Sequence, residues 1–379
     1  MLGLDWPYRR HTDIFEGTQR YAAQHGWHCD IDEFVDRTLS KCSRKTVPYD
    51  GVIARATQAV AAQTARLKLP IVNVWASTPA KGLATVIPNV EAMGRIRAEH
   101  LLDRGFSRFA CLVRMNDPSG SLEAQAFVAR LAEAGFRCPV TAVPSAAKAV
   151  ERSRRSYEIT AHWVDSLKPT TGVYVYDEHA ARQVIQICRN RGWSVPHDIA
   201  IIAGDNERTL CSHPAPGLTS IEVGFDRIGY EAARLLDQLM DGGSRPTRPL
   251  VLPPIGLVAR ASTDFFAVDD PLIAEALRYI SSHLREPIGV DDIAAAVDTS
   301  RRTLENRFRS EMGITVAAEV RRLRIEMAKR LLTESGEPIR LIARETGFRT
   351  SKQLSEVFRR ELDTTPRAFR KQMKVERAV

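Results

Sequence analysis

The chain has 379 residues, of which 44% are hydrophobic and 26% charged, and its formal net charge is +8. The length predicts two or three domains, and the composition is that of a globular protein that needs no disulfide bonds. The charge is uneven, because residues 271–379 carry a net +6 and residues 1–270 only +2. A basic domain behind a nearly neutral one favours a nucleic-acid partner, although a basic surface alone is often merely solvated.

Several classes of protein are disfavoured by features that the sequence lacks. Proline and two arginines interrupt the opening stretch MLGLDWPYRRH too early for a signal sequence, and no run of about 18 apolar residues predicts a membrane span. The six cysteines form no CxxC pair, so we expect reduced thiols in a cytoplasmic protein and no metal. No GxSxG, Walker loop or HExxH is present, so we expect neither an enzyme nor a cofactor.

Up to about residue 260, short apolar runs alternate with amphipathic stretches. The apolar runs, interpreted as buried strands, are 51–55, 70–75, 109–114, 172–176 and 200–205, and the amphipathic stretches are 91–104, 121–134, 178–191 and 226–240. This alternation predicts an α/β fold with parallel strands and helices on both faces of the sheet. In such sheets, ligands bind beyond the carboxyl ends of the strands.

Aromatic and polar side chains follow several of these strands, where a ligand would bind. They are Asp5, Trp6 and Tyr8 after an initial strand, and then Trp75, Asp177, Asp205 and Asn206. Flat aromatic rings combined with carboxylates and an amide suit a sugar or a similar polyol. The alternative for each acidic residue is that it caps the following helix.

The pattern changes near residue 241, where glycine and proline become frequent. We expect a first domain over residues 1–262, a linker over 263–271 and a purely helical domain over 272–374.

Within the helical domain, residues 291–309 and 339–360 repeat one plan. Each copy has a short helix with a small residue, then a residue that tolerates positive φ, then a Ser or Thr cap that opens a second helix with apolar residues at i and i+4. In chain order these are Ala294, Asp298, Ser300, Leu304 and Phe308, and then Ala343, Gly347, Thr350 or Ser351, Leu354 and Phe358. The plan predicts two helix-turn-helix units.

An amphipathic segment, 316–332, joins the two copies and predicts one long helix. Two reading helices held apart in this way can enter successive major grooves of DNA, about 34 Å apart. The residues expected to face DNA are Arg301, Arg302, Thr303, Glu305, Asn306 and Arg309 in the first copy, and Ser351, Lys352, Ser355 and Glu356 in the second. Such side chains can discriminate bases, although Glu305 could instead pair with a neighbouring arginine. We expect sequence-specific duplex DNA as the partner, and the alternative is a helical protein-interaction module.

The segments IARETGF (342–348), S-x-x-L-x-x-x-F (351–358) and DTTPRAFR (363–370) are distinctive. Through them the helical domain resembles the AraC/XylS family of bacterial transcription factors. The segments YDGVIAR (49–55), 88–112 and IAIIAGDNE (199–207) resemble the sugar-binding domains of lac-repressor-type regulators and periplasmic sugar-binding proteins. This second resemblance implies two α/β lobes with a sugar in the cleft between them.

A sugar domain in front of an AraC-type domain resembles the order of the xylose-operon regulator family. The resemblance implies an activator of sugar-utilisation genes that binds D-xylose or a similar pentose and acts on RNA polymerase as a homodimer. It also implies sugar contacts from Asn89, Asp177, Asp205 and Asn206. Two positions depart from the family pattern: Ala124 stands where an arginine is usual, and Asn89 where an aspartate is usual. The alternative is therefore a DNA-binding regulator with a non-sugar or degenerate effector pocket.

Overall fold

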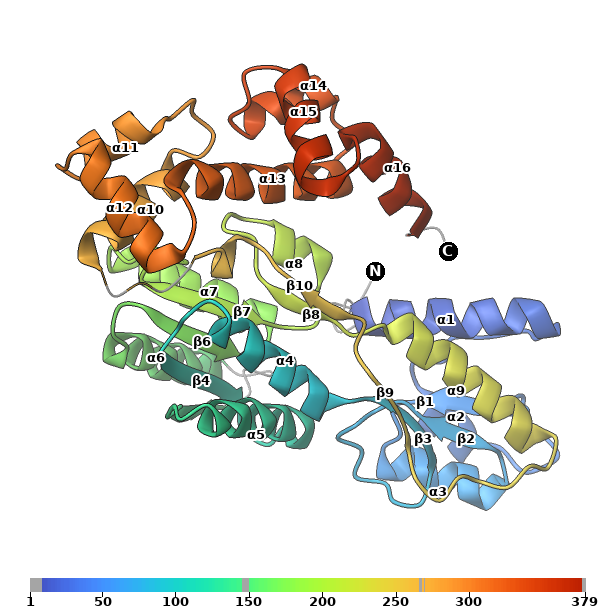
Figure 1. Cartoon of the computed structure of the whole chain (residues 1–379). Coiled ribbons are helices and arrows are strands. Elements are labelled where there is room, and N and C mark those ends of the chain that lie inside the picture. Colours follow the sequence, from blue (N-terminus) through green and yellow to red (C-terminus); the bar gives the residue numbers. More distant parts are fainter. Residues whose placement is uncertain (1–8, 145–149, 266–267, 269, 377–379) are drawn as a thin grey trace. The chain divides into compact units, whose positions relative to one another are not determined.

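The computed structural model describes residues 9–144, 150–265, 268 and 270–376, and the chain divides into two compact units between Asp264 and Phe265. Each unit is described by itself. The described strands all lie in the first unit, and the described elements of the second unit are all helices (Figure 1).

One lobe of the first unit is built on a four-stranded parallel sheet with the order β1-β2-β3-β9. Its strands are β1 (Val52–Ala54), β2 (Ile71–Asn73), β3 (Ala84–Pro88) and β9 (Leu250–Leu252), and its helices are α1 (Arg9–His25), α2 (Val35–Ser40), α3 (Gln58–Leu67) and α9 (Phe225–Met240). Apolar residues of α9 pack on β2 and β3, while α2 and α3 bury a second cluster against β1. Helices therefore cover both faces of this sheet, as parallel strands require.

The other lobe has a second parallel sheet with the order β5-β4-β6-β7. Its strands are β4 (Arg108–Arg114), β5 (Val140–Val143), β6 (Thr171–Val175) and β7 (Ile199–Ala203), and its helices are α4 (Val90–Leu102), α5 (Pro118–Glu133), α6 (Val150–Ser166), α7 (Glu178–Asn190) and α8 (Arg208–Ser212). Every residue of β6 and β7 is buried, which explains their continuous apolar sequence.

The chain passes between the lobes at three places: from β3 into α4, from β8 (Ser220–Glu222) into α9, and from β9 into β10 (Gly256–Val258). Strands β8 and β10 pair antiparallel beside β7, and a short 3-10 turn, η1 (Ala261–Thr263), follows. Two parallel α/β lobes joined by three crossings are the periplasmic-binding-protein arrangement.

The five strands expected from apolar runs and the four helices expected from amphipathic stretches are all present, with bounds shifted by a few residues. Helices α1, α2, α3, α6 and α8 and strands β3, β5, β8 and β10 were not expected. The initial strand expected before Asp5 lies outside the described residues.

The second unit contains α10 (Pro271–Ser282), α11 (Val290–Ala296), α12 (Arg301–Met312), α13 (Val316–Glu334), α14 (Ile339–Glu345), α15 (Ser351–Leu362) and α16 (Pro366–Glu376). The pairs α11–α12 and α14–α15 are the two expected helix-turn-helix units, and α13 is the expected long connector (Figure 1).

The turns of the two units have the expected conformation. Asp298 and Gly347 have φ values of 48° and 73°. The hydroxyls of Ser300 and Thr350 accept hydrogen bonds from backbone N–H groups three residues later, so Thr350 rather than Ser351 caps α15. The apolar anchors of both second helices, Leu304, Phe308, Leu354 and Phe358, are completely buried.

Candidate functional site

Asp177 lies at the carboxyl end of β6, where the chain enters α7. Its Oδ1 accepts a hydrogen bond of 2.7 Å from the N–H of Ala180, so it caps the helix as the alternative interpretation allowed. Its Oδ2 accepts from Arg114, at the end of the neighbouring strand β4. The Arg114 guanidinium also lies over the ring of Tyr176, 4.8 Å from its centroid. Asp177 is thus part of a charged and aromatic wall at the strand ends.

Asp205 and Asn206 form the turn after β7, but their side chains have different surroundings. Asp205 is about one third exposed (33%), and its Oδ1 lies 3.8 Å from Nη2 of Arg97. Asn206 is buried: its amide donates to Glu222 at 2.6 Å and accepts from Arg260 at 2.6 Å. Asn206 therefore ties the turn to β8 and the end of the first unit, while Asp205 is the residue presented to solvent.

In the other lobe, Trp75 follows β2, and one face of its ring is covered by the Arg55 guanidinium, 4.8 Å from the centroid. Nη1 of Arg55 lies 3.5 Å from Nε2 of His11. Burial, followed by the charges of Arg55 and Arg10, lowers the pKa of His11 to about 4. The imidazole is consequently neutral, and its Nε2 can accept a hydrogen bond from the Arg55 guanidinium.

Asn89 is the N-cap of α4, because its Oδ1 accepts from the N–H of Ala92 at 3.0 Å. Its backbone N–H donates to the carbonyl of Leu252 in β9. Its structural role is thus established at a lobe crossing, and its predicted sugar contact stays a prediction. The predicted ligand residues Asp5, Trp6 and Tyr8 lie outside the described residues.

A small hydrogen-bonded cluster joins the two lobes. The Ser77 hydroxyl, from the loop after β2, donates to Asp117 at 3.2 Å and lies 2.8 Å from the Ser119 hydroxyl. The Ser119 N–H donates back to Ser77 at 3.0 Å. Asp117 caps α5 just beyond β4, so the contact connects strand ends of the two sheets.

Sequence reasoning missed Arg55, Arg114, Ser77 and Asp117, all of which lie at these strand ends. The signal was available for two of them. Arg55 directly follows β1 and Arg114 is the last residue of β4, so a search for polar residues at every strand end would have included them.

Ala124 is buried in α5, beside a buried ion pair. Nε of Arg97 donates to Oε1 of Glu123 at 2.6 Å, and Arg97 is only 1% exposed. Burial raises the pKa of Glu123, and the neighbouring Arg97 opposes that rise. A guanidinium is therefore present beside the turn after β7, although it comes from Arg97 of α4 and not from position 124.

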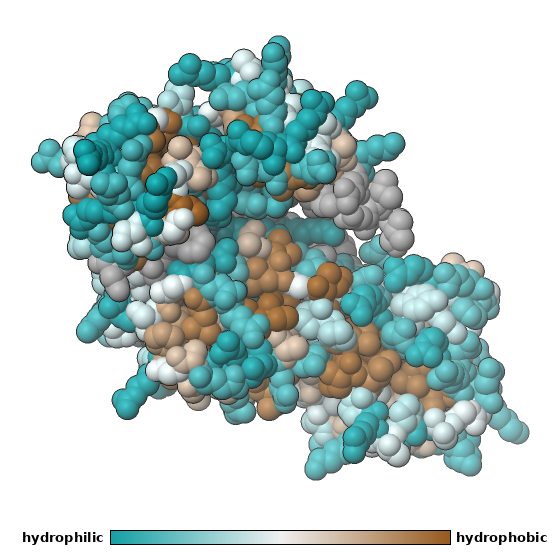
Figure 2. All heavy atoms as spheres, in the orientation of Figure 1, coloured by the Kyte–Doolittle hydropathy of each residue, from teal (hydrophilic) through white to brown (hydrophobic). Residues whose placement is uncertain are grey.

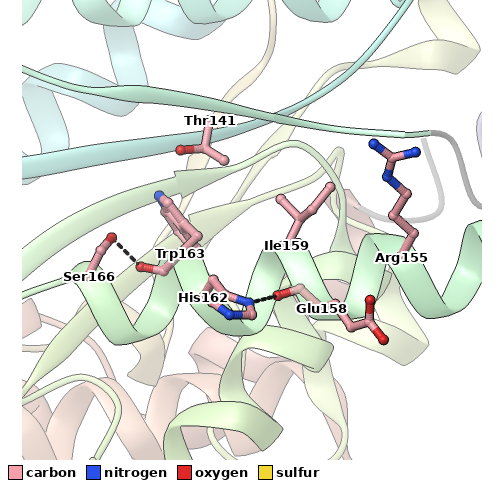
Figure 3. A pocket seen from close by; sticks show the side chains of 7 residues that line it. All are labelled: Thr141, Arg155, Glu158, Ile159, His162, Trp163 and Ser166. Carbon is pink, nitrogen blue, oxygen red and sulfur yellow. Dashed lines mark hydrogen bonds between the residues drawn. The ribbon is translucent and has the colours of Figure 1, made fainter.

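A separate pocket lies between β5 and α6, lined by Thr141, Arg155, Glu158, Ile159, His162, Trp163 and Ser166 (Figure 3). Polar contacts within it stay on the helix, such as the bond from His162 Nδ1 to the Glu158 carbonyl. No predicted ligand residue lines this pocket. We do not assign it to the effector.

In the first helix-turn-helix unit, Leu304 and Phe308 are buried, and Arg302, Thr303, Asn306 and Arg309 are exposed. Arg301 is bonded to two carboxylates, those of Asp291 and Glu305, each at 3.1 Å. The pairing of Glu305 with a neighbouring arginine is therefore present. The outward surface of α12 is thus dominated by Arg302, Asn306 and Arg309, which we call the first reading face.

In α15, Lys352 and Glu356 are exposed with charged atoms 4.0 Å apart, while Ser351 and Ser355 are half-buried. The Ser355 hydroxyl donates to the Ser351 carbonyl at 2.8 Å, so it is turned toward its own helix. Gln353 and Arg359, which were not predicted, are exposed on the same outward side. Arg359 is eight residues after Ser351, just as Arg309 is eight after Arg301, so the internal repeat could have identified it. We call Lys352, Gln353, Glu356 and Arg359 the second reading face.

The surface of the helical unit is largely hydrophilic on the side shown in Figure 2. Among the described residues, no helix is long and apolar enough to cross a membrane, and no group of three His, Cys, Asp or Glu side chains is arranged to hold a metal ion.

Comparisons with known proteins agree with this division. A model of a periplasmic binding protein-like domain matches residues 98–263, and a model of a helix-turn-helix domain matches residues 293–372. The xylose operon regulatory protein of Escherichia coli (strain K12) is 30% identical over 371 residues, which are 94% of this chain and 93% of that protein. The protein of the same name from Haemophilus influenzae is 33% identical over 208 residues, which are 55% of this chain and 54% of that protein.

Solved structures give the same result. The structure of the xylose-binding transcription activator xylR matches with a TM-score of 0.75 and 27% identity, covering 97% of this chain and 96% of that chain. The CelR–cellobiose complex of a transcriptional regulator, with a TM-score of 0.55 and 19% identity over 67% of this chain and 79% of that chain, shares the fold of the first unit. The chain belongs to the family of xylose operon regulatory proteins, transcription regulators that join a periplasmic-binding-type α/β domain to an AraC-type helix-turn-helix domain.

Proposed function

We propose that this chain is a sugar-responsive activator that binds operator DNA through both reading faces. The observation that carries the proposal is the pair of helix-turn-helix units joined by the 19-residue helix α13. A helix of that length spans about 28 Å, which is close to the spacing of roughly 34 Å between successive major grooves on one side of a duplex. One rigid connector can thus present two reading helices to adjacent turns of DNA.

The two helix-turn-helix units are joined by contacts that limit their movement relative to each other. Arg285, after α10, pairs with Glu345 of α14 at 3.1 Å. Arg324 of α13 donates to the carbonyls of Leu284 and Glu286. These contacts connect the segment after α10 to the connector α13 and to α14 of the second helix-turn-helix unit. A preorganised spacing reduces the entropy lost on binding.

The reading faces have the chemistry that base recognition needs. Arg302 and Arg309 can donate to guanine, Asn306 can pair with adenine, and Glu356 can accept from cytosine. The remaining basic side chains, including Arg359, would contact phosphates. Acidic side chains among the arginines favour selective reading over purely electrostatic binding, because they repel a phosphate backbone.

For the effector, we propose D-xylose or a similar pentose in the cleft between the lobes. Asp177, Asp205 and Arg114 would supply charged groups for hydroxyl recognition, and Trp75 would supply an aromatic face from the other lobe. The full-length relatives named for xylose support this choice. A sugar bound by both lobes would favour their closed arrangement, and the change would reach the DNA-binding unit through residues 263–271. A ligand can shift such an equilibrium only by its differential affinity for the two arrangements.

We further propose that the protein acts in the cytoplasm as a homodimer and contacts RNA polymerase. Two copies would supply four helix-turn-helix units, and an activator must recruit the polymerase to a promoter. Analytical ultracentrifugation of the full chain with and without operator tests the dimer. A monomer in both samples would contradict it.

The second candidate is a DNA-binding regulator with a different or inactive effector pocket. It is favoured by Ala124 and by the engagement of Asn89 in helix capping. The test is a thermal-shift panel of pentoses and hexoses on the full chain. A true effector at 100 times its Kd adds about 2.7 kcal/mol of stability, which raises the Tm by several degrees.

A matched control is Asp165→Asn, which changes a half-exposed carboxylate that pairs with Arg191 near the amino end of β6, away from the carboxyl ends of the strands. Asp205→Asn should reduce the shift at a given sugar concentration, and Asp165→Asn should leave it unchanged. If no sugar shifts the wild-type Tm, the sensing role is wrong and the second candidate stands.

A further inference from the structure

The turn that carries Asp205 has a backbone conformation that does not form easily on its own. Gly204 has a φ of 69° and Asn206 a φ of 64°. The left-handed region is accessible to glycine without penalty but costs other residues free energy. Such a turn persists only where surrounding groups hold it, and here the groups that do so are buried and charged.

Glu178 holds the turn from one side. Its Oε1 accepts hydrogen bonds from the backbone N–H groups of Asp205 at 2.8 Å and Glu207 at 2.9 Å. Glu178 is 7% exposed, and burial, followed by the negative charge of Asp205, raises its pKa to about 7. A Cβ atom on Gly204 would lie 1.9 Å from Cδ of Glu178, so the fit also requires glycine.

Arg97 holds the turn from the other side. Its Nη2 donates to the carbonyl oxygen of Gly204 at 2.8 Å. Its Nε is bonded to Glu123, and its guanidinium lies over the ring of Tyr174, 4.9 Å from the centroid. Its Nη1 is buried and has no hydrogen-bond partner in the part of the chain that the structure describes.

The Gly204 carbonyl and the Asp205 N–H belong to a single peptide group. The Arg97 guanidinium donates to its oxygen, and its N–H donates to the Glu178 carboxyl group. Both ends of one peptide plane are therefore held by side chains of complementary polarity. Rotation of this plane would break both bonds and would turn the Asp205 side chain away from its present direction. Burying two charged groups is costly, and well-packed apolar residues usually give equal or greater stability. Stability alone therefore does not account for this arrangement.

We propose that Arg97 and Glu178 are positioning residues that fix the direction of the Asp205 carboxylate toward the effector. The proposal rests on the proposed function, in which Asp205 contacts the sugar. Glu178 acts through the peptide group, Arg97 acts through it and also faces the Asp205 carboxylate at 3.8 Å, and neither needs to touch the sugar itself. They set the affinity of the site by keeping its acceptor oriented before the sugar arrives, which lowers the ordering cost of binding.

The test is the Kd of D-xylose, or of the pentose that scores best in the panel, measured by titration calorimetry on full-length variants. Glu178→Ala removes the acceptor and should weaken binding at least about tenfold, because two N–H groups lose their partner. Glu178→Gln keeps an oxygen at that place and should restore the affinity to within about threefold. Arg97→Lys keeps the charge beside Glu123, but one ammonium cannot reproduce the fork, so binding should weaken about fivefold or more.

The chain offers matched controls on an exposed ion pair, one member of which shares α4 with Arg97. Arg95 of α4 pairs with Glu133 of α5 on the exposed side of these helices, at 2.9 Å. Arg95→Lys and Glu133→Ala make the same chemical changes away from the turn and should leave the Kd unchanged.

A double-mutant cycle with Asp205→Ala separates positioning from general destabilisation. If Glu178 acts through Asp205, Glu178→Ala should cost no further affinity once Asp205 is removed. Equal losses in both backgrounds would overturn the positioning role, and so would an unchanged Kd in Glu178→Ala and Arg97→Lys. Those results leave the sugar-sensing function intact, whereas a wild-type chain that binds no pentose would refute both proposals.

Discussion

Replacing Arg302 by alanine should weaken operator binding and relax its sequence specificity at one base position. Arg302 is exposed on the first reading face and forms no ion pair among the described residues. An arginine that pairs with a guanine contributes about 1–3 kcal/mol of discrimination, so the Kd should rise roughly 5- to 150-fold. If Arg302 contacts a phosphate instead, the loss should be similar for all sequences and the slope of log K against log salt should fall by about 1.

Arg301 provides the internal comparison, because it is the preceding residue of the same helix. Its guanidinium is already bonded to Asp291 and Glu305, so a new contact with DNA must replace existing ones. Arg301→Ala should therefore cost less operator affinity than Arg302→Ala. Fluorescence anisotropy with labelled operator, at several salt concentrations, measures both variants. Equal losses, or a larger loss for Arg301→Ala, would refute the assignment of the first reading face.

Three further predictions concern the turn, the cleft and the buried carboxyl group. Gly347→Ala should lower the Tm of the DNA-binding unit and weaken operator binding, because a φ of 73° costs alanine about 1–2 kcal/mol and its methyl group would lie 2.4 Å from the Leu284 carbonyl; a Tm equal to wild type would contradict this. Ser77→Ala removes the hydroxyl that joins the lobes, so small-angle scattering of the unliganded chain should show a larger radius of gyration, and identical profiles would show that the cluster does not hold the lobes together. For Glu178 the folded pKa of about 7 is above the ordinary 4.5, so its favourable contribution is complete below pH 4.5 and is lost as pH rises through 7. The unfolding free energy of wild type relative to Glu178→Gln should accordingly fall by on the order of 3 kcal/mol over that range, as denaturant titrations at several pH values can establish.

Much of the fold could be predicted because the sequence patterns are strong where burial is complete. Strands β6 and β7 are buried on both faces, so they read as continuous apolar runs. Strands β3 and β5 were not predicted because each is only partly buried and its short apolar run is interrupted by a threonine. The two helix-turn-helix units were predictable because their turn, cap and anchor residues are local in sequence.

The candidate site was less predictable because its contacts are not local. The sequence shows that Asp177 and Asp205 follow strands, but not that Asp177 is bonded to Arg114, 63 residues away. The role of Arg97 is also hidden, because an arginine within an amphipathic helix normally indicates a solvated face. Only the folded chain brings Arg97 to the Gly204 carbonyl, 107 residues later.

The most direct test of the account is operator affinity measured with and without pentose. Anisotropy titrations of the full chain with its promoter region should show tighter binding when D-xylose or a related pentose is present. Asp205→Asn should show a smaller response of its DNA affinity to the same sugar concentration. Affinity that no sugar in the panel changes, in a wild-type chain that still binds DNA, would contradict the claim that the cleft controls the reading faces.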